Sequence, residues 1–479
     1  MLYRNLRSHV LRAAVFISTS VVVFSTSFAQ TTPSSKWGTY EKPFAVDSPW
    51  NSRPAKPVLY NYQIKKPVYN PGWLPSIDDG PYSLTVFKAT RTDAPMTVYG
   101  RTGTSGVNDP DSGQVRTITI PHWPAAVAAA IGTDGHADII DTETGIIHSF
   151  FQLQKNAAGN WTASMYSWSP VNGSGWGQPD HWSQGARASG VPPSAGLIRR
   201  HELADGKALY EHVLAMSLPS QTLGNGISKP SYVYPATTAD SSASANTGEI
   251  PLGALMMLPG SFNSAGIANP NLRKIAETLK TYGAYVVDRN YDTAYSIYVE
   301  NGANYTLMPK GWDANVIADL ENIRAALRQV AYSGGWLDGD GHPRQATAKA
   351  ELLSMRGIWQ LPLGGLAPAQ FDTWKQAVVF PNTAKKITAV NYTSPSKVSW
   401  SAITGGTAMR FASVTTGGAT IRLQVKVAGL VVFDSGNLAN GASSSFSWPK
   451  AAASAITVQL FAESGVNTVS SARGILTGN

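Results

Sequence analysis

The sequence contains no cysteine, which excludes disulfide bonds, thiolate nucleophiles and cysteine-based zinc or iron–sulfur sites. Charged side chains are also scarce, at 14% of 479 residues, and no run of five or six lysines or arginines occurs. Such runs are the electrostatic signature of nucleic-acid binding, so we expect no nucleic-acid partner.

Long apolar runs are missing except near the N-terminus. Arg4, Arg7 and Arg12 precede the apolar residues 13–24, and a small-x-small pattern ends at Ala29. This order is typical of a secretory signal peptide, with an uncleaved anchor as the alternative. We therefore expect residues 1–29 to be removed and the protein to be secreted or periplasmic, with no membrane insertion after cleavage.

Aromatic side chains, in contrast, are frequent, with 14 tryptophans and 19 tyrosines. Their flat amphipathic rings stack on sugars as well as pack in β-rich cores, so both interpretations stay open. Loss of the three N-terminal arginines lowers the net charge from +8 to +5. This mild basic balance is compatible with a polysaccharide partner, including an acidic one.

Short strand candidates separated by turn residues fill residues 83–168, and this spacing is typical of packed sheets. Apolar residues at helical spacing predict helices over 270–282 and 313–331, and we expect further helices over 346–357 and 369–379. Beyond residue 385 the composition changes to Ser, Thr, Gly, Ala and Val.

The predicted fold is therefore mainly β. It has a β-sandwich or jelly-roll main domain over residues 30–384 with a few covering helices, and a small C-terminal all-β sandwich over 385–479.

The segment 134–153 carries the densest group of titratable side chains. A turn at 141–145 between two β-branched and aromatic runs predicts a β-hairpin. Side chains two apart share a strand face, which would place Asp134, His136 and Asp138 together. One D-x-H-x-D pattern is compatible with a catalytic or metal site, but such a pattern is more often a hydrogen-bonded polar strand end.

Glycoside hydrolysis needs one protonated and one ionised carboxyl group, close together. Asp134 and Asp138 would lie roughly 13 Å apart along a strand, so a partner from another strand is required. Asp288 and Glu300 each end a strand candidate and are such partners. For Asp288 the structural alternative is capping of a turn.

Eliminative cleavage of a uronate polymer instead needs a His or Tyr base and a cation that neutralises the substrate carboxylate. His136 as base, Tyr285 as acid and Arg199 as clamp would supply that set. His212 is a further candidate, although a structural histidine is the alternative.

A metal site from His136, Asp138 and His148 is conceivable, but no ligand spacing supports it. We expect no cofactor. Serine-nucleophile, P-loop and dinucleotide motifs are absent, which argues against esterase, kinase and dehydrogenase functions.

Over roughly residues 45–300 the chain resembles a group of exported bacterial β-rich proteins to which no activity is attached. The resemblance implies a common fold and a shared site around Asp134, His136, His212 and Asp288. The C-terminal part resembles the β-sandwich modules appended to secreted glycan-active enzymes. The motifs that carry the first likeness are Trp50-Asn51, Asp134-Gly-His136, Gly196-Leu-Ile-Arg199, Tyr234-Pro235, Ile250-Pro251 and Tyr282-Gly-Ala-Tyr-Val-Val-Asp288.

Together these features predict a secreted polysaccharide-cleaving enzyme, with hydrolysis by paired carboxylates ahead of elimination. A non-catalytic carbohydrate-binding protein or adhesin is the other class of function. The expected carboxyl pair is Asp138 and Asp288, with His136 and His212 as further catalytic candidates. The expected sugar-contacting residues are Trp176, Trp182, Tyr285, Arg199 and Tyr234.

Overall fold

The computed structural model describes residues 36–66, 74–110, 115–177, 183–227, 229–291, 293–344, 353, 355, 357–363, 366–373, 377–391 and 405–478. The predicted signal peptide, residues 1–29, lies outside the described residues. No helix among the described residues has the length and apolar character needed to cross a bilayer.

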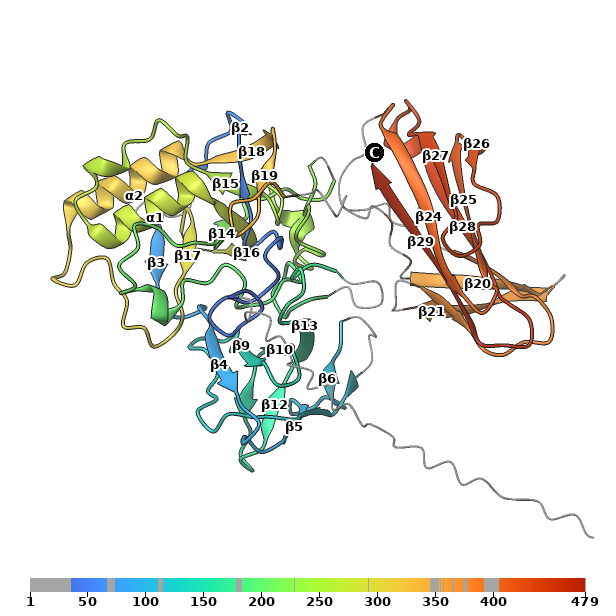
Figure 1. Cartoon of the computed structure of the whole chain (residues 1–479), viewed down its shortest axis with the longest axis horizontal. Coiled ribbons are helices and arrows are strands. Elements are labelled where there is room, and N and C mark those ends of the chain that lie inside the picture. The colour runs from blue at the N-terminus through green and yellow to red at the C-terminus, as the bar shows by residue number, and fades with distance from the viewer. Residues whose placement is uncertain are drawn as a thin grey trace, which may run out of the picture. The chain divides into compact units, whose positions relative to one another are not determined.

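The structure confirms the predicted fold class: packed β-sheets dominate, and the described part contains two α-helices (Figure 1). A seven-stranded mixed sheet lies beside the helices. Its strands, in spatial order, are β2 (Pro57–Leu59), β18 (Arg328–Ser333), β15 (Leu255–Met257), β16 (Ala284–Asn290), β14 (Leu214–Pro219), β17 (Ser296–Tyr298) and β3 (Ser76–Asp78).

A six-stranded sheet packs against the other face of the seven-stranded sheet. Its strands, in order, are β4 (Thr85–Ala89), β9 (Ala137–Asp141), β10 (Ile146–Phe151), β13 (Met165–Pro170), β6 (Val107–Asn108) and β7 (Val115–Arg116). Two smaller sheets complete this part of the chain. They contain β11 (Gln154–Lys155), β12 (Trp161–Ala163), β5 (Met96–Gly100) and β8 (Ile118–Ile120), and the pair β1 (Arg53–Pro54) and β19 (Trp336–Leu337).

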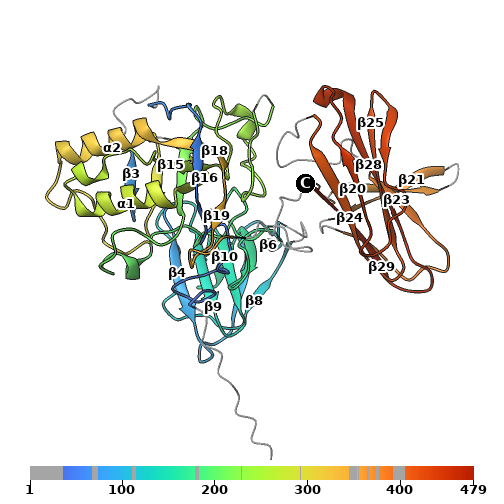
Figure 2. The ribbon, with the colours of Figure 1, turned by 45° about the horizontal axis from the view of Figure 1, so that its top comes forward.

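The helices α1 (Pro270–Thr281) and α2 (Ala314–Ala326) lie side by side along the seven-stranded sheet (Figure 2). Asn269 and Asp313 cap them, because each side chain accepts a hydrogen bond from a backbone N–H of the first turn. Both helices turn an apolar stripe to the sheet, as predicted. The helix predicted over 313–331 ends earlier, since residues from Arg328 onward form β18.

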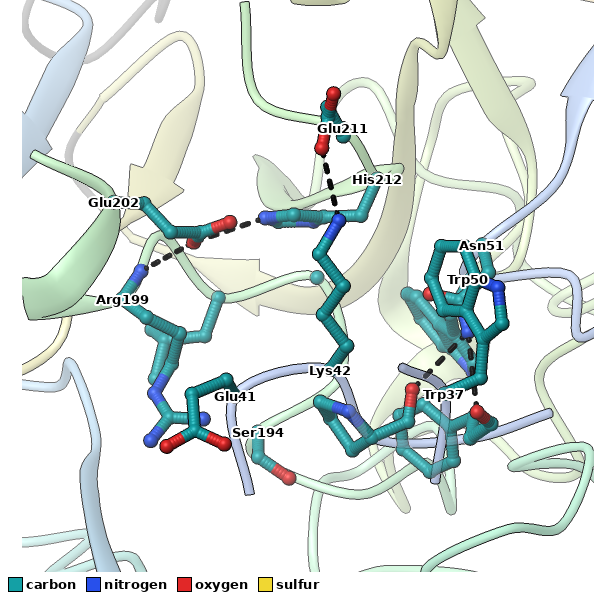
Figure 3. A pocket seen from close by; sticks show the side chains of 14 residues that line it. Trp37, Glu41, Lys42, Trp50, Asn51, Ser194, Arg199, Glu202, Glu211 and His212 are labelled. Atoms are coloured by element: carbon teal, nitrogen blue, oxygen red, sulfur yellow. Dashed lines mark hydrogen bonds and ion pairs between the residues drawn. The ribbon is translucent and has the colours of Figure 1, made fainter. Parts of the chain in front are cut away.

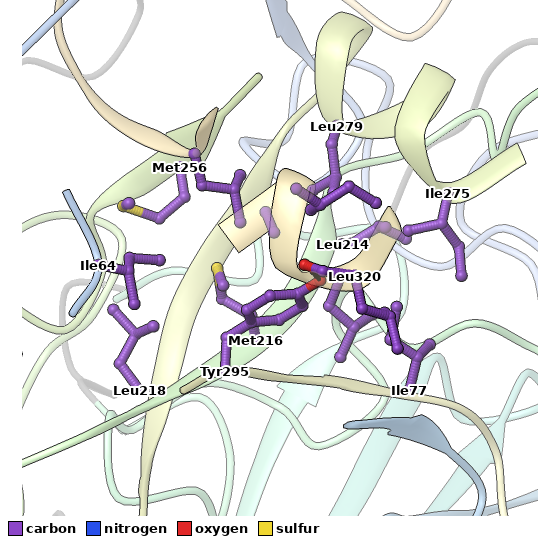
Figure 4. Close-up of a cluster of buried hydrophobic side chains, with 14 of the residues drawn as sticks. Ile64, Ile77, Leu214, Met216, Leu218, Met256, Ile275, Leu279, Tyr295 and Leu320 are labelled. Carbon is purple, nitrogen blue, oxygen red and sulfur yellow. Dashed lines mark hydrogen bonds between the residues drawn. The ribbon is translucent and has the colours of Figure 1, made fainter. Parts of the chain in front are cut away.

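Two hydrophobic cores cover the two faces of the seven-stranded sheet. On the helix side, Leu214, Met216, Met256 and Val286 meet Leu279 and other helix side chains (Figure 4). On the other side a second core joins the two large sheets. It includes Trp50 from residues 37–51, which we call the N-terminal arm. The sheet residues of this second core include Leu84, Ile140, Ile147, Ala215, Leu255, Tyr285, Val287 and Tyr298.

The C-terminal sandwich pairs strands from two sheets. One contains β21 (Leu366–Thr373), β20 (Gly357–Leu363), β23 (Thr388–Asn391), β28 (Ile456–Glu463), β25 (Thr420–Val427) and β26 (Leu430–Asp434). The other contains β22 (Val378–Phe380), β29 (Ser470–Gly478), β24 (Ala408–Thr416) and β27 (Ser443–Ser447).

The sandwich therefore includes strands that precede the expected boundary at residue 385. β20 and β21 pair with each other and β20 with β23, while β22 pairs with β29. The helix predicted over 369–379 is wrong, because its ends belong to β21 and β22. The helix predicted over 346–357 falls almost wholly outside the described residues.

Candidate active site

A register shift between β14 and β16 sets the direction of Asp288. The two strands pair in parallel, Met216 opposite Val286 and then Ser217 opposite Asp288, so Val287 has no partner. Val286 belongs to the helix-side core, and Val287 belongs to the core between the sheets. Regular alternation would return Asp288 to the helix side, but the extra residue keeps it facing the six-stranded sheet.

Arg187 meets Asp288 between the two sheets. It is 2% exposed, and its Nη1 lies 3.9 Å from Oδ2 of Asp288, whose side chain is 20% exposed. The guanidinium lies 4.5 Å from the ring centre of Tyr298, and Nη2 donates to the carbonyl of Pro193 at 3.1 Å. The contact therefore joins a buried cation to a carboxyl group that solvent reaches in part.

Two further carboxyl groups, Asp134 and Asp240, are half-buried and electrostatically coupled to Asp288. Burial is the main cause that raises the pKa of Asp288 to about 7; Arg187 opposes it, while the charges of Asp240 and Asp134 add to it. Burial also raises the pKa of Asp134 and of Asp240. The cluster therefore holds a proton near neutral pH, as carboxyl groups in catalytic pairs do.

The charge of Arg187 also acts on Asp138 and His136, but both side chains are buried and neither is placed to contact a substrate. Asp138 is fully buried on β9, where its Oδ2 accepts a hydrogen bond from the Ser194 N–H at 2.7 Å. His136 is 4% exposed; burial and the Arg187 charge lower its pKa to about 3. The expected pair of Asp138 with Asp288 needs correction, because burial removes Asp138 from solvent.

The predicted shared face of Asp134, His136 and Asp138 does not arise from strand alternation. Strand β9 begins at Ala137, and Gly135 has a φ of +45°. His148 is directed away from Asp138, since Ser149 is the residue opposite Asp138. Among the described residues, no three His, Cys, Asp or Glu side chains are placed so that together they could hold a metal ion.

Arg199 and His212 line a different pocket, of about 430 Å³, covered by the N-terminal arm (Figure 3). Arg199 Nε donates to Glu300 at 2.8 Å, and His212 Nε2 lies 3.2 Å from Glu202. Burial alone would raise the pKa of Glu202, but the charge and hydrogen bond of His212 outweigh it and lower the pKa to about 2.

The charged groups of this pocket therefore pair with one another: Arg199 with Glu300, and His212 with Glu202. Glu300 is thus not available as the carboxyl partner that the sequence suggested. The elimination site expected from His136, Tyr285 and Arg199 is not assembled, because His136 lies by Arg187, Arg199 lies in this pocket and Tyr285 lines a third site.

That third site is a groove of about 1050 Å³ that includes Tyr285 and Tyr234 in its lining. Trp176 packs edge-on against Tyr234 at 4.9 Å between ring centres and is only 8% exposed, so it supports the tyrosine from behind. Trp182 lies outside the described residues.

Sequence reasoning missed Asp240, a member of the carboxyl cluster, and Arg187, the buried cation beside Asp288. Arg187 lies in residues 183–190, which form turns and bends without a helix or strand, and such segments often carry functional residues. Asp240 lies in a second long polar segment. No local motif marks either residue; their positions follow from contacts between distant parts of the chain.

No protein-family model and no curated protein sequence matches this chain. Among solved structures, one similar chain is from accessory secretory protein 1, 2 and 3 of Streptococcus pneumoniae. It is 8% identical with a TM-score of 0.15, and the match covers 22% of this chain and 86% of that one.

Two carbohydrate-binding modules are also similar. A CBM36 module in complex with calcium and xylotriose is 10% identical (TM-score 0.14; 28% of this chain, 99% of that one). The CBM36-1 domain of a multidomain xylanase from the hindgut metagenome of Trinervitermes trinervoides is 8% identical (TM-score 0.11; 26% and 96%). At these TM-scores the likenesses carry no argument about function.

Proposed function

We propose that this chain is an exported glycoside hydrolase that cleaves a polysaccharide at the cluster of Asp288, Asp240 and Asp134. Asp288 is the general acid that protonates the leaving oxygen. Asp240 is the ionised partner, acting as base or nucleophile. The negative charge of Asp134 helps to keep Asp288 protonated. The C-terminal sandwich binds glycan or acts as a spacer in this proposal.

One observation carries the proposal: a bulge in β16 directs a partly exposed carboxyl group onto a buried arginine, within electrostatic range of two other carboxyl groups from separate segments. A glycosidase needs an acid that keeps its proton near neutral pH and a second carboxyl that loses it. The raised pKa of Asp288 fits the first role. Burial raises the pKa of Asp240, but the charge of Arg289 opposes that rise and favours the ionised form that the second role requires.

Non-catalytic carbohydrate binding is the second candidate, favoured by the aromatic groove. Elimination is less well supported, because its expected base, acid and clamp lie at three separate sites. The resemblance to exported bacterial β-rich proteins supports export and a shared site at Asp134 and Asp288, and it names no reaction.

The test incubates the protein, without residues 1–29, with neutral and acidic polysaccharides. Released reducing ends and the absorbance of unsaturated uronates are followed together. We expect reducing ends without the absorbance, and a loss of about 10²–10⁴ in rate for Asp288→Asn and Asp240→Asn.

Asp319→Asn, on the surface of α2, is the matched control and should retain full activity. A rise in absorbance would support elimination. Binding with no released ends would support the non-catalytic function, and undiminished turnover by Asp288→Asn would remove that residue from the site.

A further inference from the structure

The groove of about 1050 Å³ lies apart from the residues assigned to cleavage and has aromatic walls. Tyr332 from β18 and Trp336 from β19 line it, with Tyr234 and Tyr285. Tyr332 is 66% exposed, and Trp336 is half-buried. Sugar rings stack on flat aromatic side chains that are at least partly exposed, and Tyr332 and Trp336 provide such surfaces.

Arg344 is the one charged side chain among the described residues that line the groove. Its Nη2 donates to the Tyr234 hydroxyl at 3.4 Å, and its covered Nε has no hydrogen-bond partner in the described part of the chain. In contrast, Arg199 and Arg200 each pair with Glu300. Arg344 thus forms no ion pair with a carboxylate within the part of the chain that the structure describes, although the charge of Asp47 also acts on Tyr234.

A carboxylate is the anion that best matches a guanidinium, because the two groups form parallel charge-assisted hydrogen bonds. We propose that this groove is a subsite for a uronate residue, whose ring stacks on Tyr332 and Trp336 and whose carboxylate binds Arg344. The inference rests on the proposed function, because it names an acidic polysaccharide as the substrate class of that enzyme.

The groove and the carboxyl cluster both use residues of strand β16. Tyr285 lines the groove, and Asp288 lies three residues further along the same strand, roughly 10 Å away at ~3.3 Å per residue. The bulge places both side chains on the face of β16 that faces the six-stranded sheet. Asp288 itself does not line the groove, and Val287 between the two residues is packed in the core between the sheets.

The test measures binding by calorimetry on the protein carrying Asp288→Asn, so that no substrate is consumed. The ligands are tetrasaccharides of galacturonate, mannuronate, guluronate and glucuronate-substituted xylose, each compared with its carboxyl-reduced counterpart. We expect at least one acidic tetrasaccharide to bind ten-fold or more tightly than its reduced form. Arg344→Gln should weaken that binding about 10- to 100-fold and abolish the preference.

Tyr332→Ala should weaken acidic and reduced ligands by similar factors, since it removes stacking alone. The matched controls are Arg91→Gln, an exposed arginine paired with Glu143, and Tyr99→Ala, an exposed tyrosine on β5; neither should change binding.

The inference is overturned if no acidic tetrasaccharide is preferred over its reduced form, or if Arg344→Gln binds as tightly as the parent protein. Its failure is separable from failure of the proposed function. Binding that depends on Arg344, together with no cleavage by the unaltered protein, would contradict hydrolysis and support the uronate subsite.

Discussion

Asp288 is an acidic side chain at a position that disfavours its charge. Only 20% of it is exposed, and burial together with the negative charges of Asp240 and Asp134 outweighs the opposing charge of Arg187, which lies 3.9 Å away. A group in this setting holds its proton to a higher pH than in the unfolded chain, so its titration is linked to folding.

The linkage has a definite sign. The pKa of Asp288 is about 7 when folded and 3.8 in its ordinary state, so the folded protein binds more protons between those values. Stability should therefore fall as the pH rises through this window. Because asparagine cannot ionise, Asp288→Asn should gain stability relative to the parent by ~3 kcal/mol between pH 4 and pH 8.

Urea unfolding at pH 4, 6 and 8 measures this difference. Asp434→Asn is the contrasting control, since its hydrogen bonds with Arg422 lower the pKa of Asp434 and its loss should destabilise the protein at neutral pH. A parallel pH dependence of the parent and Asp288→Asn would contradict the assignment.

At the scale of residues, the sequence predicts which side chains can do chemistry but not which ones solvent reaches. The side chains of Asp288 and Asp134 are partly exposed, whereas Asp138 is fully buried and accepts a hydrogen bond from the Ser194 N–H. The charges of Arg187 and Asp240 both act on Asp288. No local sequence pattern marks either residue, because only folding brings their segments close to β16.

At the scale of elements, the two helices are predictable because their caps and apolar stripes are local features. The bulge at Val287 is not, since it depends on how β16 pairs with β14, a strand 70 residues earlier. The same limit explains the wrong helix over 369–379. Its residues pair with β20 and β29, and those distant contacts override local spacing.

A close approach beside the groove gives a test at this scale. Gly253 has a φ of +83° and donates its N–H to Val286 at 2.6 Å, and a Cβ there would overlap the Val233 carbonyl. Gly253→Ala should therefore cost about 3 kcal/mol or more.

Gly311→Ala is the matched control. Gly311 has a φ of +91° with no atom near its missing Cβ, so its substitution should cost only ~1–2 kcal/mol. Equal losses of unfolding free energy in the two variants would show that crowding at Gly253 is unimportant.

At the scale of the whole molecule, the mainly β class is predictable from short strands with regular turns and from the change in composition near residue 385. The start of the C-terminal sandwich is not, because β20–β22 look like part of the preceding domain until their partners are known.

Fragments test this boundary. A fragment of residues 353–479 keeps the partners of β23 and β29, so we expect cooperative thermal unfolding by circular dichroism. A fragment of residues 385–479 lacks β20–β22 and should unfold at least several degrees lower or fail to fold. Equal unfolding temperatures would restore the boundary at residue 385.

The most direct test of the account is the pH dependence of reducing-end release from an acidic polysaccharide by the unaltered protein and by Asp288→Asn. The account predicts that kcat/KM of the unaltered protein falls with an apparent pKa near 7 as Asp288 loses its proton. It predicts that Asp288→Asn loses at least 100-fold in rate. A variant that cleaves as fast as the parent, or a parent that releases no reducing ends, would contradict it.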